Sequence, residues 1–449
     1  DNYQRMTETP ILKLVISLSI PTVISMLVTN IYNLADTAFV GQLGNSASGA
    51  VGIVFGFMSI LQAIGFLFGQ GGGSILSRKL GAKEDEAATK FASTAFFGAL
   101  FVAIIVEIIC FIFIDDLVRI LGSTPTIMPY AKTYITYILL GSPFIVTSFT
   151  MNNILRYEGK ASLGMVGLVA GSIINIVGDP ILMFTFNMGI AGAGLSTCLS
   201  QIISFLILLS MFIRGKTSVR LSIKNISFGF KDYSDIFTTG FPSLLRQALN
   251  SFATIALNFF AKVYGDAAIA AMSIVSRLVF FVVSVGLGIG QGFQPVSSFN
   301  YGAKKYKRVK EAALTTITLG EGILFILSII VFIFSKDLIR IFRDDPVVIE
   351  IANRALKLQC LTLVTIPLCM VSEMLYQSTG KKLGAALLSS MRSGLIFIPV
   401  LVILATLRGL KGIQEAQPLA YIISMIPGII AYKIYMDKLP IEKEAQPLA

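Results

Sequence analysis

Residues 96–114 read FFGALFVAIIVEIICFIFI, and Glu107 is the one charged side chain in this run. A helix that crosses a membrane needs about 20 consecutive apolar residues, so this run has the length and composition of one. It lacks the regular alternation of apolar and polar residues that a membrane β-strand would show. The segment therefore predicts a helix that spans a lipid bilayer.

The composition of the whole chain extends this prediction. Of 449 residues, 55% are hydrophobic and 14% are charged, against roughly 25% charged residues in soluble domains. Histidine is absent, which excludes a Ser-His-Asp triad, and the four cysteines lie in apolar runs without CxxC spacing. We expect no cofactor and no disulfide framework. The net charge of +11 fits basic loops on the cytoplasmic side of a membrane better than a nucleic-acid partner.

Twelve apolar segments near or above spanning length predict an all-α polytopic membrane protein. Lys and Arg concentrate in the loops of one side, which places both termini in the cytoplasm. The expected segments are 11–39, 47–76, 88–114, 128–155, 161–186, 189–213, 234–262, 266–299, 311–335, 347–377, 383–407 and 411–436.

The sequence repeats itself with a constant offset of 221 residues. This offset aligns Pro21 with Pro242 and the run 69–71, Gly-Gln-Gly, with the same run at 290–292. Six helices separate equivalent positions, so two pseudo-symmetric six-helix bundles are expected to run parallel through the membrane. Transporters built this way move cargo between or within halves that rock. A duplication without a transport role is the alternative.

A polar stretch near the midpoint divides the two halves. The sequence predicts an N-lobe with helices 1–6 (1–214), a cytoplasmic linker (215–233), a C-lobe with helices 7–12 (234–437) and a C-terminal tail (438–449). The tail ends in Glu-Ala-Gln-Pro-Leu-Ala, a second copy of residues 415–420. We interpret this tail as partly artefactual and exclude it from the functional argument.

Two aspartates inside the apolar segments are the main candidates for function, because a charged carboxylate in hydrocarbon is costly. Asp36 lies in the first segment, and Asp179 follows Asn175 by four residues, which puts both side chains on one helix face. Pro180 lacks an N–H and leaves the Ile176 carbonyl as an additional ligand. Such oxygen donors suit a hard cation, and two adjacent carboxylates can also take up a proton. A purely structural role in helix packing is the alternative.

Three glutamates give a weaker signal. Glu107, Glu321 and Glu373 lie in apolar segments without local basic partners. A structural salt bridge and a role in coupling are equally open for them. The available partners are the mid-segment arginines Arg246, Arg277 and Arg392.

Two glycine-rich runs, 69–73 and 286–292, do not match a nucleotide-binding loop. No Walker lysine follows them, and no strand precedes them. Small residues in membrane helices permit close approach and bending. The runs therefore predict hinge or close-contact positions in helices two and eight.

Together these features resemble the MATE family (multidrug and toxic compound extrusion), in particular its bacterial DinF/MepA-like branch. The resemblance rests on Asn33-Leu34-Ala35-Asp36-Thr37 in helix one, Gly81-Ala82-Lys83 after helix two and Asn175 to Pro180 in helix five, and it covers the chain except the tail. It implies a Na⁺- or H⁺-coupled antiporter, not an enzyme, that exports amphiphilic and often cationic drugs. It further implies a monomer in contact with lipid in the plasma membrane of a bacterium.

The resemblance also implies site residues. The ion-coupling site of prokaryotic members falls here on Asp36, Asn175, Asp179 and Thr197, which would also be the Na⁺ ligands. Drug contacts in the same cavity would come from Tyr32, Asn152, Asn153 and Ser172. The NorM branch carries a carboxylate shortly after the proline of helix seven, whereas this chain has Asn250 and no acid between 242 and 253. That difference favours coupling in the N-lobe.

Two other functions remain open. A lipid-linked oligosaccharide flippase of the same superfamily would need a strongly cationic cavity, and the three mid-segment arginines all lie in the second half. An intramembrane aspartyl protease would use Asp36 and Asp179 as its pair, but the sequence lacks the motifs typical of those enzymes.

Overall fold

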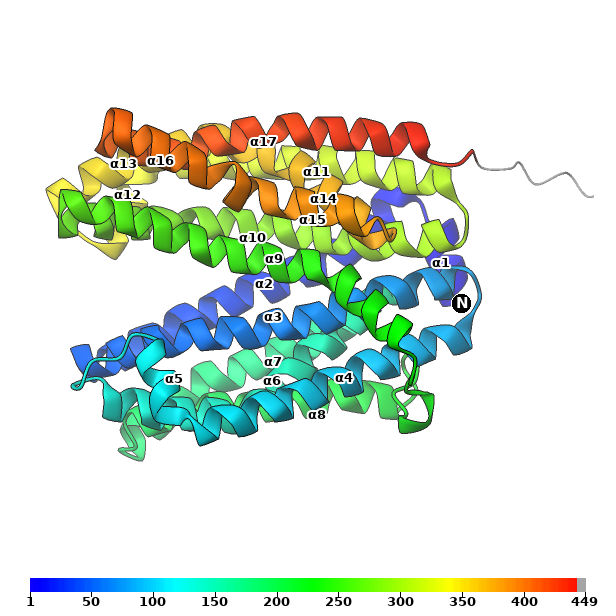
Figure 1. Ribbon diagram of the computed structural model, residues 1–449, viewed down its shortest axis with the longest axis horizontal. Helices are drawn as coiled ribbons and strands as arrows, with labels where there is room; N and C mark the ends of the chain where they lie inside the picture. Colours follow the sequence, from blue (N-terminus) through cyan, green and yellow to red (C-terminus); the bar gives the residue numbers. More distant parts are fainter. Residues whose placement is uncertain (442–449) are drawn as a thin grey trace, which may run out of the picture. The chain divides into compact units, whose positions relative to one another are not determined.

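Figure 1 shows the computed structural model of the protein, which describes residues 1–441. All regular elements in this range are helices, and no strand occurs among them. The all-α fold expected from the apolar segments is confirmed. The hexapeptide copy at 444–449, and with it most of the predicted tail, lies outside the described residues.

The helices of the first half match the first six predicted segments closely. In the predicted linker, 215–233, one short helical turn occurs before residue 230, and the last four residues already belong to the next long helix. The elements are α1 (Asn2–Glu8), α2 (Ile11–Gly41), α3 (Asn45–Gly81), α4 (Asp85–Ile112), α5 (Ile114–Ile120), α6 (Met128–Tyr157), α7 (Ala161–Pro180), η1 (Ile181–Thr185), α8 (Ile190–Ile213) and η2 (Ile223–Asn225).

The second half repeats this order, with more interruptions inside its long helices. Its elements are α9 (Phe230–Ala261), η3 (Lys262–Tyr264), α10 (Asp266–Gly302), α11 (Tyr306–Ile333), α12 (Ser335–Phe342), α13 (Pro346–Thr362), η4 (Leu363–Thr365), α14 (Ile366–Ser378), α15 (Lys382–Ser390), η5 (Met391–Leu395), α16 (Phe397–Arg408) and α17 (Leu410–Lys438).

Eleven helical stretches within the described chain are long and apolar enough to cross a membrane. The one predicted segment that is not among them is the seventh, 234–262, which forms α9, an uninterrupted helix of 32 residues. Its central turns carry Arg246, Gln247 and Asn250, which lower its hydropathy. A helix with such a polar middle fits a segment that faces protein or a cavity rather than lipid.

The chain forms two compact units whose boundaries do not coincide with the two halves of the sequence. One unit contains Ile24–Leu244, and the other contains Tyr3–Val23 together with the chain from Leu245 onward. The boundaries fall inside α2 and α9, just after Pro21 and Pro242, where each proline removes a backbone hydrogen bond from its helix. The units therefore differ from the predicted lobes 1–214 and 234–437, because the order of segments does not say which bundle each half of a helix packs against.

Close helix contacts occur at both glycine-rich runs, as predicted. A Cβ atom on Gly71 of α3 would overlap the carbonyl oxygen of Ile236, within the first half of α9. At the equivalent position of the repeat, a Cβ atom on Gly292 of α10 would lie 2.6 Å from Cα of Ser19 in α2. Beside it, the hydroxyl of Thr22 donates a hydrogen bond to the carbonyl oxygen of Gly288 over 2.5 Å. Glycine at these positions lets two helix backbones approach each other.

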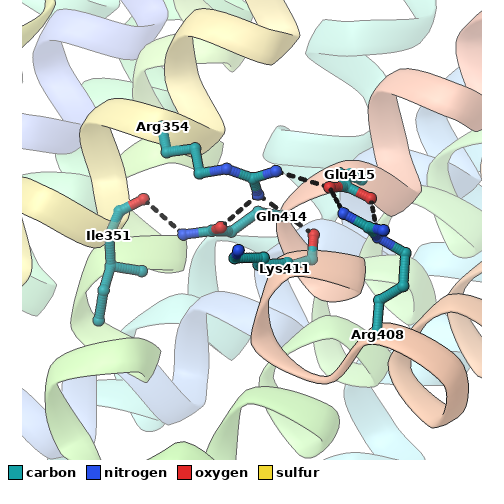
Figure 2. A network of polar contacts seen from close by, with 6 residues as sticks. All are labelled: Ile351, Arg354, Arg408, Lys411, Gln414 and Glu415. Carbon is teal, nitrogen blue, oxygen red and sulfur yellow. Dashed lines mark hydrogen bonds and ion pairs between the residues drawn. The ribbon is translucent and has the colours of Figure 1, made fainter.

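A polar network ties α13 to the turn between α16 and α17 (Figure 2). Glu415 accepts from Arg354 over 2.6 Å and from both Nε and Nη2 of Arg408 over 2.8 and 2.9 Å. Gln414 accepts from Arg354 over 2.6 Å and donates to the carbonyl oxygen of Ile351 over 3.0 Å. Glu415 begins the first copy of the repeated hexapeptide, so this copy is an integral part of the fold.

Candidate functional site

Asp36 and Asp179 lie in the interior of the unit formed by Ile24–Leu244. Asp36, in the last third of α2, is 7% exposed, and Asp179, in the last turn of α7, is 1% exposed. Their carboxyl groups are close enough for a hydrogen bond when one of them carries a proton. Folding therefore brings together two acids that are far apart in the sequence.

The partners of these carboxylates are few. The Tyr134 hydroxyl on α6 donates to Asp36 Oδ2 over 3.3 Å. Asp36 Oδ1 and both oxygens of Asp179 are buried and meet no hydrogen-bond donor within residues 1–441. No lysine or arginine of the described chain contributes a charge to either group. The site thus holds carboxylate oxygens that the protein itself leaves unsatisfied.

Neutral oxygen and amide groups line the same place. Asn175 Nδ2 donates to Thr197 Oγ1 over 3.5 Å, and Ser196 Oγ donates to Asn175 Oδ1 over 3.1 Å. Asn175 is fully buried, and Thr197 is 1% exposed. The structure therefore brings together all four residues of the expected ion-coupling set. Their role in binding an ion remains a prediction.

The shape of α7 explains how Asn175 and Asp179 share a face. The i, i+4 spacing directs both side chains inward towards α8, where Gly178 allows close approach: a Cβ atom there would lie 2.7 Å from Ser196 Oγ. Immediately after Pro180 the helix widens into the π-turn η1, Ile181–Thr185. Single π-turns inside membrane helices occur frequently at functional sites.

A narrow pocket with a cavity volume of about 20 Å³ adjoins the carboxylates. Tyr32 and Ser172 line it, as expected for drug contacts, and Asn175 connects it to the acidic pair. The Tyr32 hydroxyl lies near the side chains of Asn175 and Gln201. The full lining is Thr29, Tyr32, Met58, Gln62, Ile145, Phe149, Leu168, Gly171, Ser172, Asn175, Ser200, Gln201 and Ser204.

Asn152 and Asn153 do not line this pocket. Asn153 donates to the carbonyl oxygen of Phe149 over 2.8 Å and accepts from Arg156 over 2.7 Å, so its amide serves the packing of α6. Asn152 packs against Gly164, where a Cβ atom would overlap its side-chain oxygen. Both residues lie closer to the end of α6 than the pocket does, which their position in the sequence could not show.

The other unit has a different arrangement around Glu373. Its Oε1 atom forms an ion pair with Arg246, whose Nε lies 2.7 Å away, and accepts a hydrogen bond from Ser389 Oγ over 2.8 Å. The predicted arginine partner for this glutamate is therefore found. Asn250, in α9, is exposed. Within the described part of this unit, the polar pocket beside Glu373 contains no second carboxylate.

Two contributors to the site were not anticipated. Tyr134 lies in the fourth apolar segment without a motif around it, and Ser196 precedes Thr197 directly. A general signal was available, because a buried acid such as Asp36 needs a hydrogen-bond donor, and a polar residue on a neighbouring helix is expected to supply it. The sequence does not reveal which helix supplies it.

Comparison with known proteins agrees with this geometry. The family model described as MatE matches residues 21–181 and 242–403, so it matches the two halves separately and begins each match at the equivalent prolines. The chain belongs to the MatE family. The predicted repeat and the twelve-helix architecture of MATE transporters are confirmed with it. This MatE protein is therefore a multi-pass membrane transporter of a family found in bacteria.

Named relatives cover the MatE chain almost completely. It is 29% identical to the multidrug export protein MepA of Staphylococcus aureus over 97% of this chain and 96% of that protein. It is also 29% identical to MepA of Staphylococcus saprophyticus over 95% and 94%. These relatives agree with the MepA-like branch suggested by the motifs.

Solved MATE structures share the fold. A crystal structure of a MATE protein in complex with MaL6 has a TM-score of 0.93 at 26% identity, covering 98% of this chain and 99% of that one. The outward-facing conformation of a multidrug resistance MATE family transporter of the MOP superfamily has a TM-score of 0.92 at 26% identity, with 98% of both chains covered.

Proposed function

We propose that this protein is a cation-coupled antiporter that exports amphiphilic, often cationic drugs by alternating access. The observation that carries the proposal is the facing pair Asp36 and Asp179, in which three of the four carboxylate oxygens are buried without a hydrogen-bond donor among the described residues. The multidrug export proteins MepA among the relatives support drugs as the cargo.

The pair requires a positive partner from solution. Two unit charges about 4 Å apart repel by roughly 4 kcal/mol in typical protein surroundings, and burial adds a desolvation cost for each. No basic side chain of the described residues offsets this cost at Asp36 or Asp179. A bound Na⁺ or a proton would relieve it, and the oxygens of Asn175 and Thr197 suit Na⁺ as additional ligands.

Competition between ion and cargo would couple their movements. Asn175 belongs both to the carboxylate cluster and to the pocket lined by Tyr32, so occupancy of one site changes the other. Linkage requires this effect to be reciprocal: a cargo that weakens ion binding is itself released by the ion. Aromatic faces such as Tyr32 and Phe149, with the thioether of Met58, suit varied organic cations.

A lipid-linked oligosaccharide flippase is the second candidate. It would need positive charge in the second half of the chain, where Arg246 is neutralised by Glu373. That ion pair favours the antiporter. Scrambling of a fluorescent lipid-linked oligosaccharide by purified protein in vesicles would support the flippase instead. We further propose a monomer with both termini in the cytoplasm of a bacterial cell.

The deciding experiment combines binding and resistance. Asp36→Asn and Asp179→Asn should each abolish Na⁺ binding in calorimetry and drug resistance in cells, with normal amounts of protein in the membrane. Asp116→Asn, a change at an exposed acid, is the matched control and should retain both. Loss of resistance with no Na⁺ binding in the parent protein, but with drug-induced proton release, assigns H⁺ as the ion. Full resistance in both site variants contradicts the proposal.

A further inference from the structure

A pocket unrelated to the carboxylate pair lies at the end of the unit that contains α10, α14 and α17. Its volume is about 320 Å³, and it opens where these three helices end. The lining combines three tyrosines, two lysines and three apolar residues. These are Tyr301, Tyr376, Lys381, Ile434, Tyr435, Lys438, Leu439 and Pro440.

Two of the tyrosines form a fixed wall. The Tyr376 hydroxyl donates to the carbonyl oxygen of Ala431 over 2.7 Å, and the Tyr435 hydroxyl donates to Thr379 Oγ1 over 2.9 Å. Their rings pack edge to face with centroids 5.3 Å apart. Both side chains are thus held by hydrogen bonds that join α17 to α14 and to Thr379 directly after it.

The charge of the pocket is positive. The Lys381 ammonium lies 6.0 Å from the centroid of the Tyr301 ring, and Lys438 ends α17. Among residues 1–441, neither lysine is within ion-pair distance of a carboxylate, and no acidic side chain lines the pocket. Two ammonium groups therefore face one aromatic-walled space without a counter-charge from the described chain.

The internal repeat shows that this pocket is not a by-product of the bundle. The offset of 221 residues pairs Tyr301 with Leu80, Tyr376 with Leu155 and Lys381 with Lys160. Lys160 donates to the carbonyl oxygen of Lys216 over 2.8 Å, so the linker after α8 occupies its ammonium group. Tyr301 and Tyr376 therefore have no counterpart in the first half of the repeat, and within the described chain the Lys381 ammonium group lacks the carbonyl partner that Lys160 has.

We propose that this pocket binds the phosphate group of an anionic phospholipid. Lys381 and Lys438 would contact the phosphate, while the Tyr301 ring and hydroxyl lie at the polar–apolar boundary where such groups are enriched in membrane proteins. Ile434, 44% exposed on α17, offers an apolar surface for the acyl chain. Basic pockets at the ends of membrane helices are suited to lipid head groups. The proposal does not depend on the ion that drives transport.

The complete absence of tryptophan from the sequence makes a direct test available. Tyr301→Trp places a single reporter in the pocket of the full-length chain. In vesicles of phosphatidylcholine, brominated phosphatidylglycerol is expected to quench this tryptophan several-fold more effectively than brominated phosphatidylcholine at the same mole fraction. Adding Lys381→Gln and Lys438→Gln should remove that preference, since each lysine near an anionic lipid contributes roughly fivefold in affinity.

Matched variants separate the pocket from general surface charge. Lys224→Gln with Lys310→Gln removes two exposed lysines elsewhere and should leave the preference unchanged. Tyr376→Trp provides a second reporter if Tyr301→Trp does not fold. Equal quenching by the two brominated lipids, or a preference that survives the double lysine change, overturns the proposal. Fluorescence changes with millimolar inorganic phosphate in detergent, but no lipid preference, would assign the site to free phosphate and also overturn it.

Discussion

Tyr134 donates a hydrogen bond to Asp36 Oδ2 over 3.3 Å, while Asp36 Oδ1 has no donor in the part of the chain that the structure describes. One oxygen is therefore held by α6, and the other is left without a donor beside Asp179. This arrangement orients a buried carboxylate without satisfying it. A group bound between the two acids would complete the coordination that the protein leaves open.

Changing Tyr134 to Phe should weaken ion binding without abolishing it. A hydrogen bond to a charged group contributes about 1.5–3 kcal/mol, so the loss should lower Na⁺ affinity by roughly tenfold or more. Calorimetric titration of purified protein measures this change. Tyr137→Phe is the control, because Tyr137 lies one turn further along α6 and packs against Gly194 rather than an acid. Equal affinities in the Tyr134 variant and the parent would contradict the assigned orientation.

Gly292 should not tolerate a methyl group. The Cβ atom of Gly292→Ala would lie 2.6 Å from Cα and 2.7 Å from the backbone nitrogen of Ser19, and backbone atoms cannot move aside cheaply. We expect most of the variant to be lost as folded protein, visible as a reduced monodisperse peak in size-exclusion chromatography. Gly322→Ala, where nothing lies within 4 Å, should behave like the parent. Normal yield of both variants would show that α2 and α10 are not fixed against each other.

Most of the fold could be predicted from the sequence because its signals are periodic and long. Apolar runs gave the helix positions, and the repeat gave two related bundles. The exchange of the first halves of α2 and α9 could not be predicted. Pro21 and Pro242 mark places where a helix can bend, but a proline carries no information about which bundle receives the preceding turns.

Part of the candidate site could also be predicted, because two of its acidic residues interrupt apolar segments. Asp36 and Asp179 are recognisable because acids are costly in apolar segments, and the spacing of Asn175 to Asp179 fixes a shared face. The contribution of Tyr134 depends on how α6 packs, and tyrosine is common in membrane helices. Asn152 and Asn153 were predicted to line the cavity, but Asn153 bonds to Arg156 and Asn152 packs against Gly164. A polar residue in a membrane helix does not reveal from the sequence whether it contacts a cavity or another helix.

Glu158 gives the protein a pH-dependent stability. Its side chain is fully buried after the end of α6, where it accepts from the Val219 N–H over 2.8 Å and its second oxygen has no donor within residues 1–441. Burial raises the pKa of this carboxyl group to about 8, although Lys160 and the Val219 N–H act in the opposite direction. The folded state therefore holds a proton that the unfolded chain releases near pH 4.

Stability should consequently fall as the pH rises. Between roughly pH 4 and pH 8 the folded state binds more protons than the unfolded state, so the free energy of unfolding decreases with pH, by up to a few kcal/mol. Glu158→Gln removes this contribution. Its thermal midpoint should depend less on pH between 5 and 9 than that of the parent. Glu86→Gln changes an exposed acid and should follow the parent. Parallel profiles for Glu158→Gln and the parent would exclude the linkage.

The two kinds of intramembrane acid should respond oppositely to neutralisation. Asp36 faces another carboxylate, so Asp36→Asn removes repulsion and should preserve or raise the thermal midpoint while ion binding is lost. Glu373 is paired with Arg246, and the two side chains are 6% and 14% exposed. Glu373→Gln leaves that arginine without its acid and should lower stability by roughly 3 kcal/mol. Size-exclusion chromatography after heating measures both variants in the same detergent. A comparable loss of stability in both would mean that Asp36 is held by the fold as firmly as Glu373, and that its carboxylate is structural rather than reserved for an ion.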